Sequence, residues 1–400
     1  MSRRTKILIA LGLVLILTAL GIVLYFFFRP TPLPSGGDGE FPPPGEELPP
    51  TTEPPTILPP SSSGAFEPIL RQLSKVPVAG AVLGTKSGEA IVRYQERSVG
   101  NVYEIGAAGD EEIRLTNTTV SKVYEALWSK SGTALVSRYV REGGETIESF
   151  SAEIKPSATE GDGQLLGTFL PRGLPDMTVS PAGNSLFYLQ EESDGIGGIR
   201  SDLAGGNRVK LWGSPMKEWL VSWPSENKIL LLSKPSAFAD GMLLLLDPIQ
   251  GGTSILLRGI PGLTALMSPV KTEILYSASP DSTLSLHLFN NANGQPRDLS
   301  VTTFPEKCAF AKSGDRVYCG VPKVIPQGSY PDSWYQGVIP FTDEVWSITL
   351  SSGTTERISD ISGKRGSPID LVRPMVSSDE KFLVFIDKGS ETLWSLQMKE

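Results

Sequence analysis

The sequence is poor in the side chains that build most catalytic and metal sites. Its 400 residues include one histidine, His287, and two cysteines. A single histidine argues against histidine-rich metal sites and Ser–His–Asp triads, and His287 lies in an apolar strand pattern, LSLHLF. The Gly-x-Ser-x-Gly pattern of a nucleophile elbow does not occur. We therefore predict no catalytic residue, no metal and no cofactor, and interpret the chain as a non-enzyme.

Basic residues are also in deficit. The chain has 36 lysines and arginines against 44 acidic residues, a formal net charge of -8. A nucleic-acid partner requires a basic face that neutralises phosphates. The charge balance therefore argues against a nucleic-acid partner.

One apolar run is long enough to span a bilayer. Residues 7–28 hold no charged side chain and follow Arg3, Arg4 and Lys6. About 20 helical residues cross a bilayer, and flanking basic residues stay on the cytoplasmic side. We predict a cytoplasmic tail over residues 1–6 and a signal anchor over residues 7–28 that binds the lipid bilayer. The competing interpretation is a cleaved signal peptide, which has a shorter apolar region of about 7–15 residues.

Residues 29–65 hold twelve prolines together with Ser, Thr, Gly and Glu. Such a composition buries too little apolar surface to fold and stays extended. We predict a disordered stalk. It would display the rest of the chain outside the cytoplasm, in the periplasm or in the extracellular space.

A short hairpin pattern recurs along the remaining residues. Its clearest copy is Trp128 to Val136, WSKSGTALV, in which a polar turn separates two apolar runs. Taking the turn residue of each copy as a marker gives successive spacings of 44, 51, 44, 44, 43 and 66 residues. The markers are Gly88, Gly132, Gly183, Asn227, Lys271, Gly314 and Glu380. A period near 44 is typical of β-propeller blades with four strands each.

One period can be followed strand by strand. The apolar runs predict strands a to d at 219–223, 229–233, 242–247 and 253–257. The last period ends after its third strand, whereas 68–74, PILRQLS, precedes the first marker and matches a fourth strand. We therefore predict an all-β fold, a seven-bladed propeller over residues 66–400, in which the N-terminal strand completes the last blade and removes an open sheet edge.

The repeat, apolar-Ser-Pro/Lys-x-Gly-x-x-apolar-apolar, resembles that of TolB-like and WD-repeat-like β-propellers. The resemblance covers about residues 66–400, but the Gly-His and Trp-Asp dipeptides of true WD repeats are absent. It implies a propeller and carries over no ligand from any family.

The two cysteines flank one hairpin turn. Counting outward from Ser313-Gly314 sets Cys308 directly opposite Cys319. Opposed strand residues have Cα atoms about 4.5–5.5 Å apart, which suits a disulfide in an oxidising compartment. The alternative is a pair of buried free thiols.

The 66-residue spacing holds about 22 extra residues, Pro322 to Asp343, between strands b and c of one blade. Long ordered loops are usually functional, and Tyr and Trp often anchor binding sites. The b–c and d–a loops of a propeller share one face. We predict a binding site on this face from the insert and the neighbouring d–a loop: Tyr330, Trp334, Tyr335, Phe341, Lys364 and Arg365. The alternative is that the aromatic residues cap the core of their own blade.

These features favour a membrane-anchored binding or scaffold module for a protein or glycan partner at the cell envelope. The competing function is an envelope hydrolase or lyase acting on glycan or peptide in the propeller channel. A cluster of Arg, Tyr and Glu in the channel would favour that enzyme.

Overall fold

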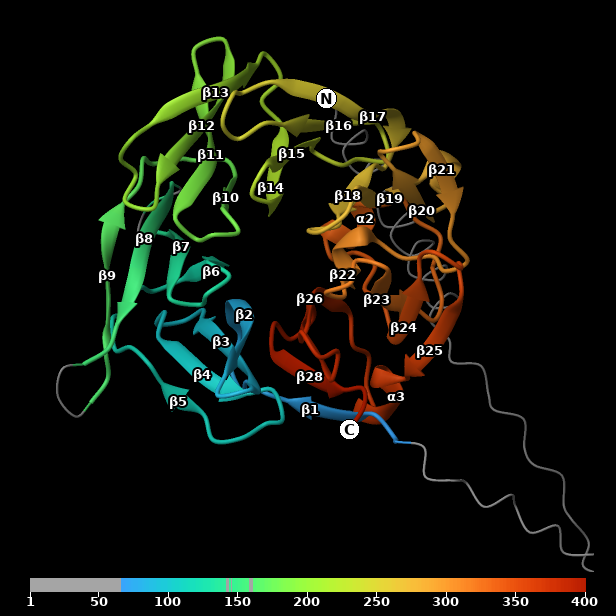
Figure 1. The fold of residues 1–400 in the computed structure, drawn as a ribbon, viewed down its shortest axis with the longest axis horizontal. Coiled ribbons are helices and arrows are strands. Elements are labelled where there is room, and N and C mark those ends of the chain that lie inside the picture. Colours follow the sequence, from blue (N-terminus) through green and yellow to red (C-terminus); the bar gives the residue numbers. More distant parts are fainter. Residues whose placement is uncertain (1–65, 142–143, 145, 158–160) are drawn as a thin grey trace, which may run out of the picture. The chain divides into compact units, whose positions relative to one another are not determined.

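The computed structural model describes residues 66–141, 144, 146–157 and 161–400. Within them, seven four-stranded antiparallel sheets stand around a ring (Figure 1). Each sheet is one blade, and in six of the seven the strands follow chain order from the centre outward. The predicted seven-bladed propeller is thus confirmed.

The blades follow one another in chain order, and each runs from an inner strand a to an outer strand d. Blade 1 is β2 (Val78–Lys86), β3 (Glu89–Glu96), β4 (Val102–Gly106) and β5 (Ile113–Arg114). Blade 2 is β6 (Val123–Trp128), β7 (Ala134–Val140), β8 (Ile147–Lys155) and β9 (Gln164–Phe169). Blade 3 is β10 (Met177–Val179), β11 (Ser185–Glu192), β12 (Gly195–Asp202) and β13 (Val209–Ser214). Blade 4 is β14 (Trp219–Ser225), β15 (Lys228–Ser233), β16 (Asp240–Leu246) and β17 (Thr253–Pro261).

Blade 5 is β18 (Thr264–Met267), β19 (Glu273–Ala278), β20 (Ser285–Asn290) and β21 (Gln295–Asp298). Blade 6 is β22 (Cys308–Phe310), β23 (Arg316–Pro322), β24 (Asp343–Thr349) and β25 (Thr355–Ser359). Blade 7 is β26 (Leu371–Val376), β27 (Phe382–Asp387), β28 (Leu393–Gln397) and, as its outer strand, β1 (Ile69–Gln72). Two short helices, α2 (Asp332–Tyr335) and α3 (Ile361–Arg365), lie in loops on one face of the ring.

The ring is closed by two strands from opposite ends of the described chain. Ile69 pairs with Gln397 and Gln72 with Trp394, so β1 and β28 form an antiparallel ladder. This is the pairing that the sequence predicts, and the C-terminus accordingly lies beside β1 (Figure 1).

The recurring hairpin is the turn between strands a and b of each blade. Gly88, Gly132, Gly183 and Gly314 have φ between 69° and 89°, a left-handed region in which a side chain is strained. Glu380 occupies the same position in blade 7 with φ 58°. Its carboxylate accepts a hydrogen bond from the Tyr318 hydroxyl at 2.8 Å, which helps to hold this strained turn.

The core lies between neighbouring sheets, where large apolar side chains from adjacent blades interdigitate. In the cluster between blades 3 and 4, Phe187 and Leu189 pack against Trp219 and Ile229, all less than 5% exposed. The predicted disulfide is present: Cys308 pairs with Cys319 across β22 and β23 with a Cα–Cα distance of 4.1 Å.

In the part of the chain that the structure describes, no helix is long and apolar enough to span a membrane. The predicted anchor over residues 7–28 and the predicted stalk over residues 29–65 lie outside the described residues.

Candidate functional site

The insert between β23 and β24 forms an aromatic core of its own. Tyr330, Trp334 and Phe341 are at most 2% exposed and pack together with Phe304, which precedes β22. The Trp334 and Phe304 rings stack with centroids 4.8 Å apart. Three of the four predicted aromatic binding residues are therefore buried, in a cluster that also draws residues from blades 5 and 7.

A buried ion cluster fastens this aromatic core to blade 7. The Lys307 ammonium is fully buried, lies 2.7 Å from the Asp343 carboxylate and also pairs with Asp370. The Trp334 indole Nε1 and the Phe341 backbone amide donate to Asp370 Oδ2 at 2.9 and 3.1 Å. Burial, together with the nearby Asp370 carboxylate and against the opposing effect of Lys307, raises the pKa of Asp343 to about 6. The two carboxylates thus share one lysine, and Asp370 also holds Trp334 and Phe341 of the insert.

The insert also reaches blade 4. The Asp332 carboxylate, at the start of α2, accepts hydrogen bonds from Ser236 Oγ at 3.1 Å and from the Ala237 amide at 2.6 Å. Ser236 and Ala237 belong to the b–c loop between β15 and β16. The insert therefore leaves blade 6, passes blade 5 and is held by blades 4 and 7, which gives it a fixed position on this face.

The remaining predicted site residues lie on the same face but have separate contacts. Tyr335 is 39% exposed and its hydroxyl donates to Glu306. Lys364 is exposed and pairs with Glu67 at 2.6 Å. Arg365 pairs with Asp387 at 2.7 Å, and its guanidinium lies 4.9 Å from the Trp394 ring centroid. The six residues therefore do not converge on one point.

The d–a loop that carries Lys364 does lie beside the insert. Asp360, the N-cap of α3, accepts a hydrogen bond from the Gly363 amide at 2.8 Å and pairs with Lys323 of the insert at 2.6 Å. The shared face that the sequence predicts is thus present, although its surface differs in composition.

Three large apolar side chains on this face point to solvent. Phe238 in the b–c loop of blade 4 is 80% exposed, and Val324 and Val338 of the insert are 73% and 70% exposed. We refer to these three side chains and Tyr335, all on this face, as the insert-face patch. Phe238 could not be predicted from the sequence, because its loop has ordinary length and shows no signal until Asp332 is seen to dock on it. Nor could composition show that Val338 faces out while Phe341 faces in.

A second group of polar side chains connects the inner parts of blades 2 and 7 with the residue before blade 3. The Glu125 carboxylate pairs with Arg138 at 2.7 Å and with Arg373 at 3.1 Å. Arg138 lies 3.6 Å from Asp176 and 5.5 Å from the ring centroid of Tyr124. These residues come from blades 2 and 7 and from the position before β10. The ring thus brings Arg, Tyr and Glu side chains together, although Arg138 is only 4% exposed.

Burial, together with the nearby Glu125 charge, raises the pKa of Asp176 to about 6. The folded state therefore binds this proton more tightly than the unfolded chain does. The stabilisation that this bound proton gives the folded state is complete below the pKa of Asp176 in the unfolded chain, near 3.8. It is lost as the pH rises through the folded-state pKa of about 6.

Asp176→Asn keeps an oxygen for the Val221 amide, which donates to Asp176 at 2.7 Å. When the pH rises from 5 to 7.5, we expect the unfolding free energy of the wild type to fall by about 1 kcal/mol more than that of the variant. Urea denaturation at both pH values measures the difference. Parallel losses in the two proteins would contradict the assignment.

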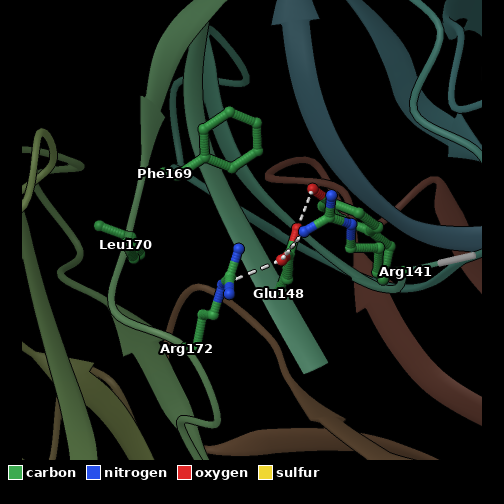
Figure 2. Close-up of a pocket in the computed structure, with 6 residues that line it drawn as sticks. Arg141, Glu148, Phe169, Leu170 and Arg172 are labelled. Carbon is green, nitrogen blue, oxygen red and sulfur yellow. Dashed lines mark hydrogen bonds and ion pairs between the residues drawn. The ribbon is translucent and has the colours of Figure 1, made fainter. Parts of the chain in front are cut away.

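A third site is a hollow of about 450 Å³ on the rim of blade 2. Figure 2 shows Arg141 and Arg172 directed at Glu148, at 3.7 and 3.1 Å. Phe169 borders the hollow and is 67% exposed. Both arginines are more than half exposed, so these ion pairs are surface interactions worth at most about 1 kcal/mol each.

Within the described residues, no group of three or more His, Cys, Asp or Glu side chains is arranged to hold a metal ion. No protein-family model matches the chain. No curated protein matches it in sequence.

Solved structures share the fold at low sequence identity. An oligogalacturonate lyase in complex with manganese matches with a TM-score of 0.51 and 10% identity, over 84% of this chain and 99% of that chain. The β-propeller domain of the Trilobed protease from Pyrococcus furiosus matches with a TM-score of 0.51 and 10% identity, over 80% and 98%. That domain has an open velcro topology, whereas β1 and β28 pair in this chain. At such identities the likeness shows a propeller and nothing about activity.

Proposed function

We propose that the propeller is a binding module that holds a protein partner against the insert-face patch. The observation that carries the proposal is the exposure of Val324 and Val338 on the insert and of Phe238 on the blade 4 loop that the insert contacts. A surface of this kind binds at low entropic cost, because its backbone is already ordered before the partner arrives.

The apolar content of the patch favours a protein over a glycan. Aliphatic side chains gain free energy by removal from water, at roughly 25 cal/mol per Å² of apolar surface buried. Clustered exposed apolar groups are typical of interaction sites, whereas single ones are common on any surface. Phe238 and the insert are joined through Asp332, so the patch spans two segments held in fixed register.

The predicted setting completes the proposal. The sequence-based prediction of a signal anchor over residues 7–28 would place the propeller and its partner outside the cytoplasm. The disulfide between Cys308 and Cys319 supports an oxidising compartment.

The test compares two variants of the full-length chain. Phe238→Ser combined with Val338→Ser removes the centre of the patch without touching the buried ion cluster. Phe169→Ser is the matched control, because this phenylalanine is also surface-exposed but lies on the rim of blade 2.

Each protein is expressed at native level in its host and cross-linked, and the partners are identified by mass spectrometry. We expect a partner of the wild type to be retained by Phe169→Ser and reduced at least tenfold by the double variant. The same partners at the same level in all three samples would refute the proposal. Loss in both variants would also refute it, because the effect would not depend on the patch.

A further inference from the structure

We propose that the channel wall formed by blades 7, 1 and 2 is a separate binding site for a carboxylate ligand, with Arg373 as the residue that binds it. The site is a hollow of about 330 Å³ lined by the inner strands β2, β6 and β26. Its charged side chains are Glu125 and Arg373, and its apolar wall includes Leu127, Trp128 and Met375.

All three inner strands depart from regular pairing at this hollow. Each one has a register shift against its strand b: between Val78 and Gly80, between Val123 and Glu125, and between Val372 and Met375. A β-bulge redirects side chains and is common beside functional sites. Arg373 lies within the bulge of blade 7, and Glu125 borders the bulge of blade 2.

Arg373 has a backbone conformation that ordinary packing does not require. Its φ of 50° is in the left-handed region, which is unfavourable for a non-glycine residue and more so before a proline, here Pro374. Strain of this type persists only where the surrounding structure enforces it, and it is concentrated at functional sites. The Arg373 side chain reaches blades 1 and 2, where it contacts Ala79 and Glu125.

The contacts of Arg373 leave part of its guanidinium available. Nη1 donates to the Ala79 carbonyl at 3.3 Å and Nη2 to Glu125 at 3.1 Å. A guanidinium has five N–H donors, and two of them suffice for a carboxylate in a fork geometry. The side chain is 53% exposed, so a ligand in the hollow can reach it.

The charge balance favours an anion over a cation. Glu125 already pairs at 2.7 Å with Arg138, whose side chain is 4% exposed. Arg138 also lies 3.6 Å from Asp176, so two arginines face two carboxylates in this cluster. Arg373 is the most exposed of the four at 53%, against 18% for Glu125 and 19% for Asp176, so the charge accessible to a ligand is mainly positive. Trp128 and Met375 supply an apolar surface for the group attached to the carboxylate.

Two kinds of ligand share this chemistry, the C-terminus of a peptide and an acidic sugar. Isothermal titration of the full-length chain distinguishes them, with N-acetyl-alanyl-leucine against its C-terminal amide and with glucuronate against glucose. We expect one carboxylate probe to bind and its uncharged counterpart to bind at least tenfold more weakly.

Arg373→Gln should weaken binding of the carboxylate probe at least tenfold. Arg172→Gln is the matched control, because Arg172 is 67% exposed and also pairs with a glutamate beside a hollow (Figure 2). It should leave binding unchanged. Glu125→Gln should strengthen binding severalfold, because it removes the carboxylate that competes for Arg373, whereas a purely structural role of the pair predicts no gain.

The proposal is overturned if neither carboxylate probe binds, if Arg172→Gln weakens binding as much as Arg373→Gln, or if Glu125→Gln fails to strengthen it. If the protein converts a bound probe into product, the hollow is an enzyme site and the proposal of a binding site is overturned.

Discussion

Replacing Lys307 with methionine is expected to lower the unfolding free energy by about 3–5 kcal/mol, since it removes the one cation that Asp343 and Asp370 share. All three side chains are at most 5% exposed. Water cannot take the place of the ammonium without opening the aromatic core of the insert. The loss should therefore far exceed that from breaking an exposed surface ion pair.

Urea denaturation of the full-length chain measures this effect. Lys364→Met is the control, because it breaks an exposed pair with Glu67 and should cost less than about 1 kcal/mol. Adding Asp343→Asn and Asp370→Asn to Lys307→Met should restore part of the loss, since no unpaired charge then remains buried. If Lys307→Met and Lys364→Met lower the unfolding free energy equally, the buried ion cluster does not stabilise the fold as expected.

Trp334→Ala is expected to destabilise the protein by about 3–5 kcal/mol, the usual range for removing a large buried aromatic side chain. The indole stacks on Phe304, donates to Asp370 and has its ring centroid 5.2 Å from the Lys388 ammonium. Its loss leaves a cavity and removes one of the donors that hold the Asp370 carboxylate.

The control for Trp334→Ala is Val338→Ala, which alters a 70% exposed residue of the same insert and should change stability by less than about 0.5 kcal/mol. Thermal unfolding followed by tryptophan fluorescence and circular dichroism compares the two. Hydrogen exchange should also show faster exchange of insert amides in Trp334→Ala. If the two variants unfold alike, the aromatic core does not anchor the insert.

The blade architecture could be predicted because it depends on local patterns. A turn residue with positive φ, such as Gly132, and the alternating apolar residues beside it recur at a spacing near 44 residues in most blades. The disulfide was predictable for the same reason, because Cys308 and Cys319 are counted from a single hairpin turn. Closure by β1 followed from a missing strand in the last period.

The surface of the insert could not be predicted, because its orientation depends on partners distant in the sequence. Trp334 is drawn inward by Asp370, 36 residues away, and Asp332 is held by Ala237, 95 residues away. A Tyr- and Trp-rich loop looks the same in sequence whether its rings face a partner or a core.

Arg373 gives no sequence signal for a related reason. It is a single arginine in an apolar strand, LVRPMV. Its partners Ala79 and Glu125 precede it by 294 and 248 residues. Closure of the ring brings them together, and Arg373 lies within the bulge of β26.

The pairing of β1 with β28 also determines the order in which the protein can be completed. Arg71 on β1 bonds with Gln397 on β28, 326 residues later, so the first strand of the propeller to be synthesised is the last to gain its neighbour. Blades 1 to 6 can form from contiguous segments, whereas blade 7 has to wait for the final residues. Until then β1 is an unpaired edge strand, and a long loop must close before the ladder forms, which slows that step. We expect that a chain interrupted only a few residues early would leave the ring open.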